Sequence, residues 1–86
     1  MDEFHKIINF LMLEQNLHFD GQYHGESNFS DSKFKYQLIS PHSGTDYKYM
    51  IRKAEKYNFD RWANSEEGSI FFENSEEIKK RYGEWS

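Results

Sequence analysis

Two segments in the middle of the chain alternate between apolar and polar residues, and this alternation constrains the fold most. Residues 33–40 and 46–53 carry an apolar side chain at every second position. These positions are Phe34, Tyr36, Leu38, Tyr47, Tyr49 and Ile51. Successive side chains of a β-strand point to opposite faces, so each segment predicts a strand with one buried face. Because Pro41 and Gly44 lie between them, the two segments predict an antiparallel hairpin.

The apolar residues of the chain are mainly aromatic. Eight Phe, six Tyr and two Trp stand against six Ile, four Leu and no Val. Each aromatic side chain buries a large area, and Tyr and Trp add a polar group that suits an interface. The chain has 86 residues, and a domain of this size buries little more than about 60% of its unfolded surface. We therefore expect one small domain with a largely aromatic core.

Helices are predicted at both ends of the chain. In residues 3–16 apolar side chains recur at helical spacing, which is typical of a helix that packs on a core. Asp2 is positioned to cap the first turn of this helix. A second, shorter helix is expected after Asn74 or Ser75, with Gly83 at its C-terminal end.

The segments between these elements are less regular. Asp20-Gly21 predicts either a tight hairpin turn or a bulge within one longer strand. The polar residues 25–32 predict a loop, and the short apolar run 68–73 predicts a strand. Residues 54–65 allow either an extension of the preceding strand or a helical turn. Residues 1–86 are thus expected to form a single α+β domain, with an N-terminal helix on a three- to four-stranded antiparallel sheet and a short C-terminal helix.

Formal charge is segregated along the sequence. Residues 1–32 carry a net charge of −5, residues 33–61 of +4 and residues 62–86 of −3, which together give the −4 of the chain. Duplex-DNA-binding proteins usually carry an excess of basic charge, which this chain lacks. There is no Cys, and no apolar stretch approaches the length of a membrane span. We therefore expect a cytoplasmic protein without disulfides and without a membrane helix.

Three residues have the types and the spacing of a possible metal site. His18, Asp20 and His24 would lie on one face of a single continuous strand, where imidazole and carboxylate groups could bind a divalent cation. A turn at Asp20-Gly21 would separate them. Exposed histidines without a ligand are the simpler interpretation, and no metal is predicted.

No catalytic motif accompanies the remaining polar residues. His42, Ser43 and Asp46 have the residue types of a catalytic triad, but the serine is not part of a nucleophile-elbow sequence. The chain also lacks a phosphate-binding loop and a dinucleotide-binding glycine pattern. We therefore expect neither an enzyme activity nor a cofactor.

Two charged surfaces are candidate binding sites, although a solvated face is the simpler interpretation of either. Acidic and Trp residues near the C-terminus could imitate a phosphate backbone and anchor a protein partner. These residues are Trp62, Glu66, Glu67, Glu73, Glu76, Glu77 and Trp85. The polar side of the predicted hairpin could instead contact phosphates through a basic face. Its residues are Lys33, Lys35, Lys48 and Arg52.

In size, acidity and lack of catalytic residues, the chain resembles the small inhibitory proteins of phages and plasmids, such as anti-CRISPR and bacteriocin immunity proteins. The resemblance is to a class and involves no specific motif. It implies a cytoplasmic protein that binds and inhibits another protein, one that handles nucleic acid, in a bacterial host. The alternative is a single-stranded nucleic-acid-binding module that uses the basic, Tyr-rich hairpin 33–53. A small enzyme is a third hypothesis, and a homodimer is compatible with all of them.

Overall fold

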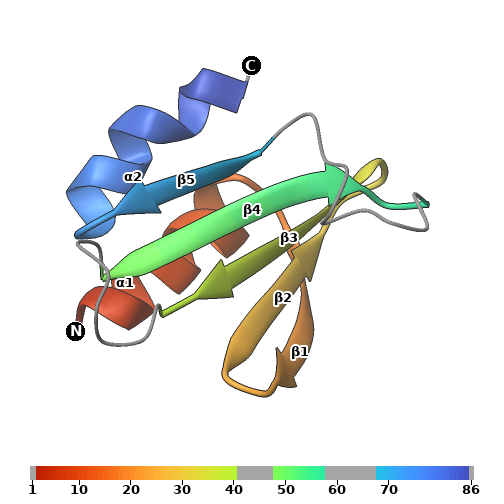
Figure 1. Cartoon of the computed structure of the whole chain (residues 1–86), viewed down its shortest axis with the longest axis horizontal. Helices are drawn as coiled ribbons and strands as arrows, with labels where there is room; N and C mark the ends of the chain where they lie inside the picture. The colour runs from red at the N-terminus through yellow and green to blue at the C-terminus, as the bar shows by residue number, and fades with distance from the viewer. Residues whose placement is uncertain (1, 41–47, 58–67, 86) are drawn as a thin grey trace.

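The computed structural model describes residues 2–40, 48–57 and 68–85, and it has the expected α+β fold (Figure 1). An N-terminal and a short C-terminal helix accompany one antiparallel sheet, which has five strands rather than three or four. The elements are α1 (Glu3–Asn9), β1 (His18–Tyr23), β2 (Glu26–Ser30), β3 (Phe34–Ile39), β4 (Tyr49–Glu55), β5 (Ser69–Phe72) and α2 (Ser75–Arg81). A π-helical turn η1 (Phe10–Glu14) extends α1, and a 3-10 turn η2 (Tyr82–Trp85) extends α2.

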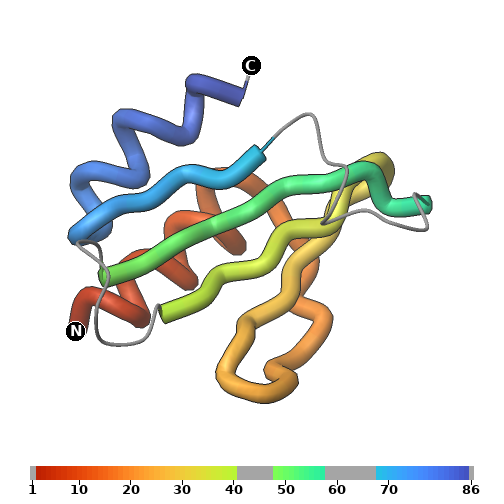
Figure 2. Tube along the Cα trace, in the orientation of Figure 1, coloured from red at the N-terminus to blue at the C-terminus, as the bar shows by residue number. Residues whose placement is uncertain are grey.

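The strands pair in chain order, each antiparallel to the next, so the sheet is a meander (Figure 2). The predicted hairpin is confirmed as β3 and β4, in which Leu38 pairs with Ile51. β4 continues past its predicted end to Glu55, so the segment that begins at residue 54 starts as an extension of the strand. The predicted strand in residues 68–73 is confirmed as β5.

Both helices pack on the same face of the sheet, and the core lies between the helices and the strands. In Figure 1, α1 runs behind the sheet. The core residues are Ile7, Phe10, Leu11, Leu17, Phe29, Tyr36, Leu38, Ile51, Ile70, Phe72 and Ile78. Aromatic rings fill the inner face of the sheet at Phe29 and Phe72, which are fully buried. Most of the other core residues are Ile and Leu, so the core is mixed and less aromatic than the composition suggests.

The first helix begins where the sequence predicts but changes geometry before its predicted end. Asp2 caps α1, because its carboxylate accepts a hydrogen bond from the backbone N–H of His5 at 2.9 Å. After Asn9 the helix widens into η1, and it ends before Asn16, which has a positive φ of 57°. The predicted helix 3–16 is therefore confirmed as a helical segment whose last part is π-helical.

The first hairpin corrects two predictions. The Asp20-Gly21 pair is not the turn: β1 runs through it with a bulge, and Gly21 has a φ of 107°. The turn lies at His24-Gly25, whose φ values of 51° and 81° are the positive values that a tight hairpin turn needs. The bulge was the alternative prediction for Gly21.

The second correction concerns the segment 25–32, which contains strand β2 rather than a loop. Its polar residues are compatible with a strand because they find partners in the sheet. The Ser27 hydroxyl, which is buried, accepts a hydrogen bond from the Gln22 side chain at 3.0 Å. Phe29, fully buried in the same strand, supplies the apolar anchor.

The C-terminal helix begins at the predicted cap, and Gly83 directly follows its C-terminal cap residue, Tyr82, as predicted. The Asn74 side chain accepts a hydrogen bond from the Glu77 N–H at 2.9 Å. Gly83 does not adopt the positive φ typical of this position, and the chain continues past it as the 3-10 turn η2. The Arg81 guanidinium donates to the Phe71 carbonyl on β5, the last strand of the sheet. No helix in the described part of the chain is long and apolar enough to cross a membrane.

The corrected position of β2 can be tested at Phe29. Phe29→Ala should lower the free energy of unfolding by about 3–5 kcal/mol, because it empties a fully buried aromatic site. Phe29→Leu fills most of the space and should cost less, about 1 kcal/mol. Urea denaturation measures both. Tyr23→Ala, which truncates a side chain that is 63% exposed on the same hairpin, serves as the control. A loss at Phe29 no larger than at Tyr23 would show that residues 26–30 are a loop.

Candidate binding surfaces

The face of the sheet that the helices do not cover carries a connected set of polar side chains. Gln37 donates to the Glu26 carboxylate at 2.7 Å and accepts from the Arg52 guanidinium at 2.8 Å. Lys35 forms an ion pair with Asp20 at 2.9 Å. Burial would raise the pKa of Asp20, but the hydrogen bond from Lys35, together with other contacts, holds it below its ordinary value. The charges on this face are thus largely engaged with one another.

The predicted basic face is only partly assembled. Lys35 and Arg52 share the uncovered face, where they have the acidic and amide partners just described. Lys33 is exposed at the opposite end of the hairpin from Lys48. Lys48 precedes β4 and lies near Glu3, whose carboxylate it helps to keep ionised. The structure therefore brings two of the four residues together and leaves the other two at separate ends.

Three residues of the predicted acidic patch gather at the start of α2. Glu73 precedes the cap residue, and Glu76 and Glu77 lie in the first turn. The Glu3 carboxylate accepts a hydrogen bond from the Ser75 N–H at 2.8 Å, which joins the first turn of α1 to that of α2. The N-terminus and the start of α2 accordingly lie at the same end of the molecule (Figure 1). Trp62, Glu66 and Glu67 lie outside the described residues.

The two acids at the start of α1 are held as carboxylates. The hydrogen bond from the Ser75 backbone lowers the pKa of Glu3, with a smaller contribution from the charges of Lys6 and Lys48. The hydrogen bond from the His5 backbone lowers the pKa of Asp2 in the same way. Negative charge at a helix N-terminus is also favoured by the helix dipole. Asp2 and Glu3 therefore keep their negative charge to a lower pH than ordinary carboxyl groups do.

Trp85, the other described residue of the predicted patch, lies away from these acids. It is at the C-terminal end of η2, roughly 13 Å of helical rise from Glu76. Its indole packs against Tyr82 and Tyr36, at ring-centroid distances of 5.3 and 6.1 Å. Burial raises the pKa of Tyr82 to about 12. Trp85 thus belongs to a partly buried aromatic cluster that packs against the core.

Asp31 organises the corner between β2 and β3. Its carboxylate accepts hydrogen bonds from the N–H groups of Lys33 at 2.8 Å and Phe34 at 2.7 Å, and from the Tyr36 hydroxyl at 3.0 Å. Burial would raise the pKa of Asp31, but these hydrogen bonds outweigh it and hold the pKa below the ordinary value. Burial, together with the Asp31 charge, raises the pKa of Tyr36. The corner is therefore fixed by an ionised carboxylate.

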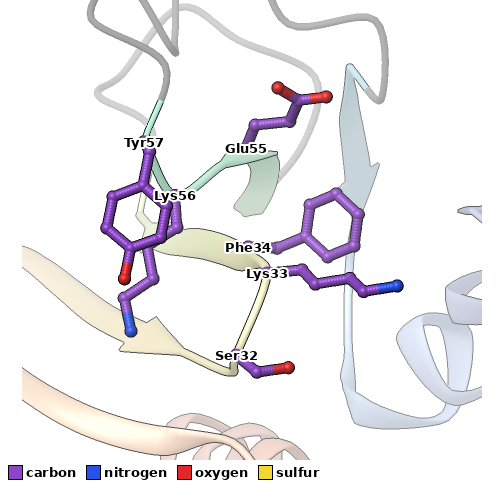
Figure 3. A pocket seen from close by; sticks show the side chains of 6 residues that line it. All are labelled: Ser32, Lys33, Phe34, Glu55, Lys56 and Tyr57. Atoms are coloured by element: carbon purple, nitrogen blue, oxygen red, sulfur yellow. The ribbon is translucent and has the colours of Figure 1, made fainter.

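A hollow that the sequence did not indicate lies beside this corner, and we name it the strand-end pocket (Figure 3). It has a volume of about 360 Å³ and lies where β3 begins and β4 ends. Its lining residues are Ser32, Lys33, Phe34, Glu55, Lys56 and Tyr57. Of these, Lys33 belongs to the predicted basic face, and Tyr57 is an aromatic residue that the sequence places in charged, irregular surroundings. The pairing of Phe34 with Glu55 brings the residues before β3 next to those at the end of β4. This pairing joins segments that are far apart in the sequence, so no local pattern predicts the pocket.

A second hollow, of about 280 Å³, lies between α1 and β1. Its lining residues are Phe4, His5, Ile8, Met12, Phe19 and Gln22. Met12 is 39% and Phe19 38% exposed, and the neighbouring Leu13 is 73% exposed. The helix 3–16 was expected to bury its apolar side chains, whereas the π-helical turn leaves Met12 and Leu13 in contact with solvent.

The residues proposed for a metal site do not converge. His18 Nε2 lies 3.6 Å from Asp20 Oδ1, but His24 is in the β1–β2 turn. Among the described residues, no group of three His, Asp or Glu side chains could hold a metal ion. His42, Ser43 and Asp46 lie outside the described residues.

Comparison with known proteins does not assign this chain to a family. It matches no protein-family model, and no curated protein and no solved structure is similar to it. The proposals below therefore depend on the geometry and charge of the described residues.

The role of Asp31 predicts a pH-dependent stability. Because the pKa of Asp31 in the folded protein is below its ordinary value of 3.8, its contribution is complete above that value. The contribution is lost as the pH falls through the lowered pKa. Asp31→Ala should therefore reduce the free energy of unfolding at pH 7 by about 2 kcal/mol, and by much less near pH 2.

Urea denaturation at both pH values measures this difference. Tyr36→Phe removes one donor to Asp31 and keeps the ring, so it should cost only about 1 kcal/mol at pH 7. An Asp31→Ala deficit that is equal at both pH values would show that the charge of Asp31 is not what fixes the corner.

Proposed function

We propose that this chain is a small cytoplasmic protein-binding module that inhibits a nucleic-acid-handling protein by occupying its phosphate-binding surface. The docking surface would be the acidic end, which consists of Asp2, Glu3, Glu73, Glu76 and Glu77. The observation that carries the proposal is the hydrogen bond from the Ser75 N–H to Glu3, because it joins the acidic first turns of α1 and α2.

The carboxylates of the acidic end are partly fixed before any partner binds. Asp2 is held by the His5 N–H at 2.9 Å, and Glu3 by the Ser75 N–H at 2.8 Å. Side chains that are already ordered lose less conformational entropy on binding. Two fixed carboxylates beside the three acids at the start of α2 offer a partly preformed negative surface, which could stand in for a phosphate backbone.

Much of this negative charge is available to a partner. Among the residues that the structure describes, Glu73 and Glu76 have no cation within ion-pair distance, and Glu77 is 3.9 Å from Arg81. Surfaces that bind nucleic acid are rich in Lys and Arg. Long-range attraction would therefore speed association of the acidic end with such a surface.

This proposed mode of action is the one that the class resemblance drawn from the sequence implies, that to small inhibitors encoded by phages and plasmids of the anti-CRISPR or immunity kind. The alternative, nucleic-acid binding through the hairpin face, has less support. Lys35 and Arg52 on that face are engaged with Asp20 and Gln37, so their capacity to contact phosphates is reduced.

Displacement of proteins from immobilised DNA tests the proposal. A bacterial lysate is bound to a DNA resin at low salt and then washed with the purified chain. We expect the chain to release a nucleic-acid-binding protein and to form a salt-sensitive complex with it. Glu73→Gln/Glu76→Gln should weaken this complex roughly tenfold, because each lost interfacial charge removes on the order of 0.7 kcal/mol.

Glu14→Gln/Glu84→Gln is the matched control. It changes the net charge by the same amount at two exposed positions outside the acidic end. The complex should be unaffected by this variant. Release of no protein, or equal weakening by the two double variants, would contradict the proposal.

A further inference from the structure

The strand-end pocket lies at the opposite end of the sheet from the acidic end. Its residues come from the corner before β3 and from the end of β4, whereas Lys48 and the helix N-termini lie at the other end of the same strands (Figure 1). A ligand of this pocket would therefore not compete with a partner at the acidic end.

Backbone contacts hold the two walls of the pocket together. The Lys56 N–H donates to the Lys33 carbonyl at 2.8 Å, which continues the β3–β4 pairing past Glu55. The Lys56 ammonium donates to the Asp31 carbonyl at 3.3 Å. Asp31 in turn fixes the backbone of residues 33 and 34, as described above. The pocket is therefore largely formed before a ligand binds.

Lysines outnumber carboxylates around the pocket: Lys33, Lys53 and Lys56 lie there with Glu55 and Asp31. The charge of Lys53 acts on Asp31, whose pKa it helps to lower. Lys33 and Lys56 line the pocket, and among the described residues neither has a carboxylate within ion-pair distance. A third ammonium, that of Lys53, lies 4.2 Å from the centroid of the Phe34 ring. Glu55 is the acidic residue of the lining, and in Figure 3 its carboxylate points away from the Lys56 ammonium. An anionic ligand is thus favoured.

The pocket also presents aromatic surface. Tyr57 is 87% exposed, which is the largest exposure among the large hydrophobic side chains of the described residues. Phe34 belongs to the other wall (Figure 3). An exposed Tyr ring offers a flat face on which a nucleic-acid base can stack, and neighbouring lysines can contact the phosphates.

We infer that the strand-end pocket binds a nucleotide unit of single-stranded nucleic acid, with the base stacked on Tyr57 and the flanking phosphates near Lys33 and Lys56. The volume of about 360 Å³ is near the lower limit of ligand pockets, about 300–1,000 Å³, which suits one nucleotide. Bases within a duplex are already stacked on each other, so duplex DNA fits this site poorly.

Fluorescence anisotropy with a labelled oligothymidylate of about eight nucleotides tests the inference. We expect binding at about 50 mM salt that weakens as salt is added. Tyr57→Ala should weaken binding roughly tenfold, since it removes the stacking surface. Because Tyr57 is 87% exposed, this variant should keep the thermal stability of the unaltered chain.

The charged contacts have a matched control. Lys33→Gln/Lys56→Gln should reduce the salt dependence of log K by about 1.4, because each lost contact with a single strand contributes about 0.7. Lys79→Gln/Lys80→Gln makes the same change of charge at two exposed positions of α2, and it should leave binding unchanged.

Further probes separate the sources of the ligand. Thymidine monophosphate that competes at the same concentration of nucleotide units would assign the pocket to free nucleotides, and this would overturn the single-strand inference. A polyglutamate peptide that competes as well as the oligonucleotide would show that charge alone is recognised. Absence of binding at low salt, or binding that Tyr57→Ala does not change, would also overturn it. None of these outcomes depends on whether the acidic end binds a protein.

Discussion

Burial of a single face of the sheet is the constraint on which the rest of this structure depends. The two helices and η2 pack on that face, and the main hydrophobic cluster lies in the layer between them and the sheet. The other face must remain compatible with water, and its ion pair and amide contacts meet that requirement. Because the chain is short, this layer is thin, and large rings such as Phe29 and Phe72 supply much of its buried area.

Asp31 shows how one polar group connects this layer to the surface. Its carboxylate fixes the backbone at the start of β3 and also accepts from Tyr36, whose ring is part of the core. Tyr36 stacks with Tyr82 at a centroid distance of 6.4 Å. The same carboxylate therefore supports the strand-end pocket on one side and the contact between sheet and C-terminal turn on the other.

The parts of the fold that follow from local pattern could be predicted from the sequence. The β3–β4 hairpin has an apolar residue at every second position, and the caps at Asp2 and Asn74 have suitable residue types. Strand β2 was missed because its Ser and Asn residues resemble a loop until Gln22 and its other partners are known. Gly83 follows the cap residue of α2 as predicted, but the 3-10 turn that continues past it was not foreseen, because that turn depends on rings that pack on the core.

The candidate sites also combine features that a local sequence pattern predicts with features that depend on tertiary contacts. Glu73, Glu76 and Glu77 are neighbours in the sequence, but the contribution of Glu3 needs a hydrogen bond between residues 72 positions apart. The strand-end pocket needs the register that sets Phe34 opposite Glu55. A local signal was nevertheless present at Asp31, since Asp often accepts from the backbone N–H two residues later and so starts a turn.

The two outer strands of the sheet carry features that oppose growth of the sheet. On β1, the bulge at Asp20-Gly21 interrupts the regular row of backbone hydrogen bonds. On β5, the Phe71 carbonyl already accepts a hydrogen bond from the Arg81 guanidinium. An added strand needs a regular row of unoccupied backbone donors and acceptors, which neither edge provides in full. The chain is thereby protected against polymerisation through its strand edges, and recognition of other molecules is left to its side chains.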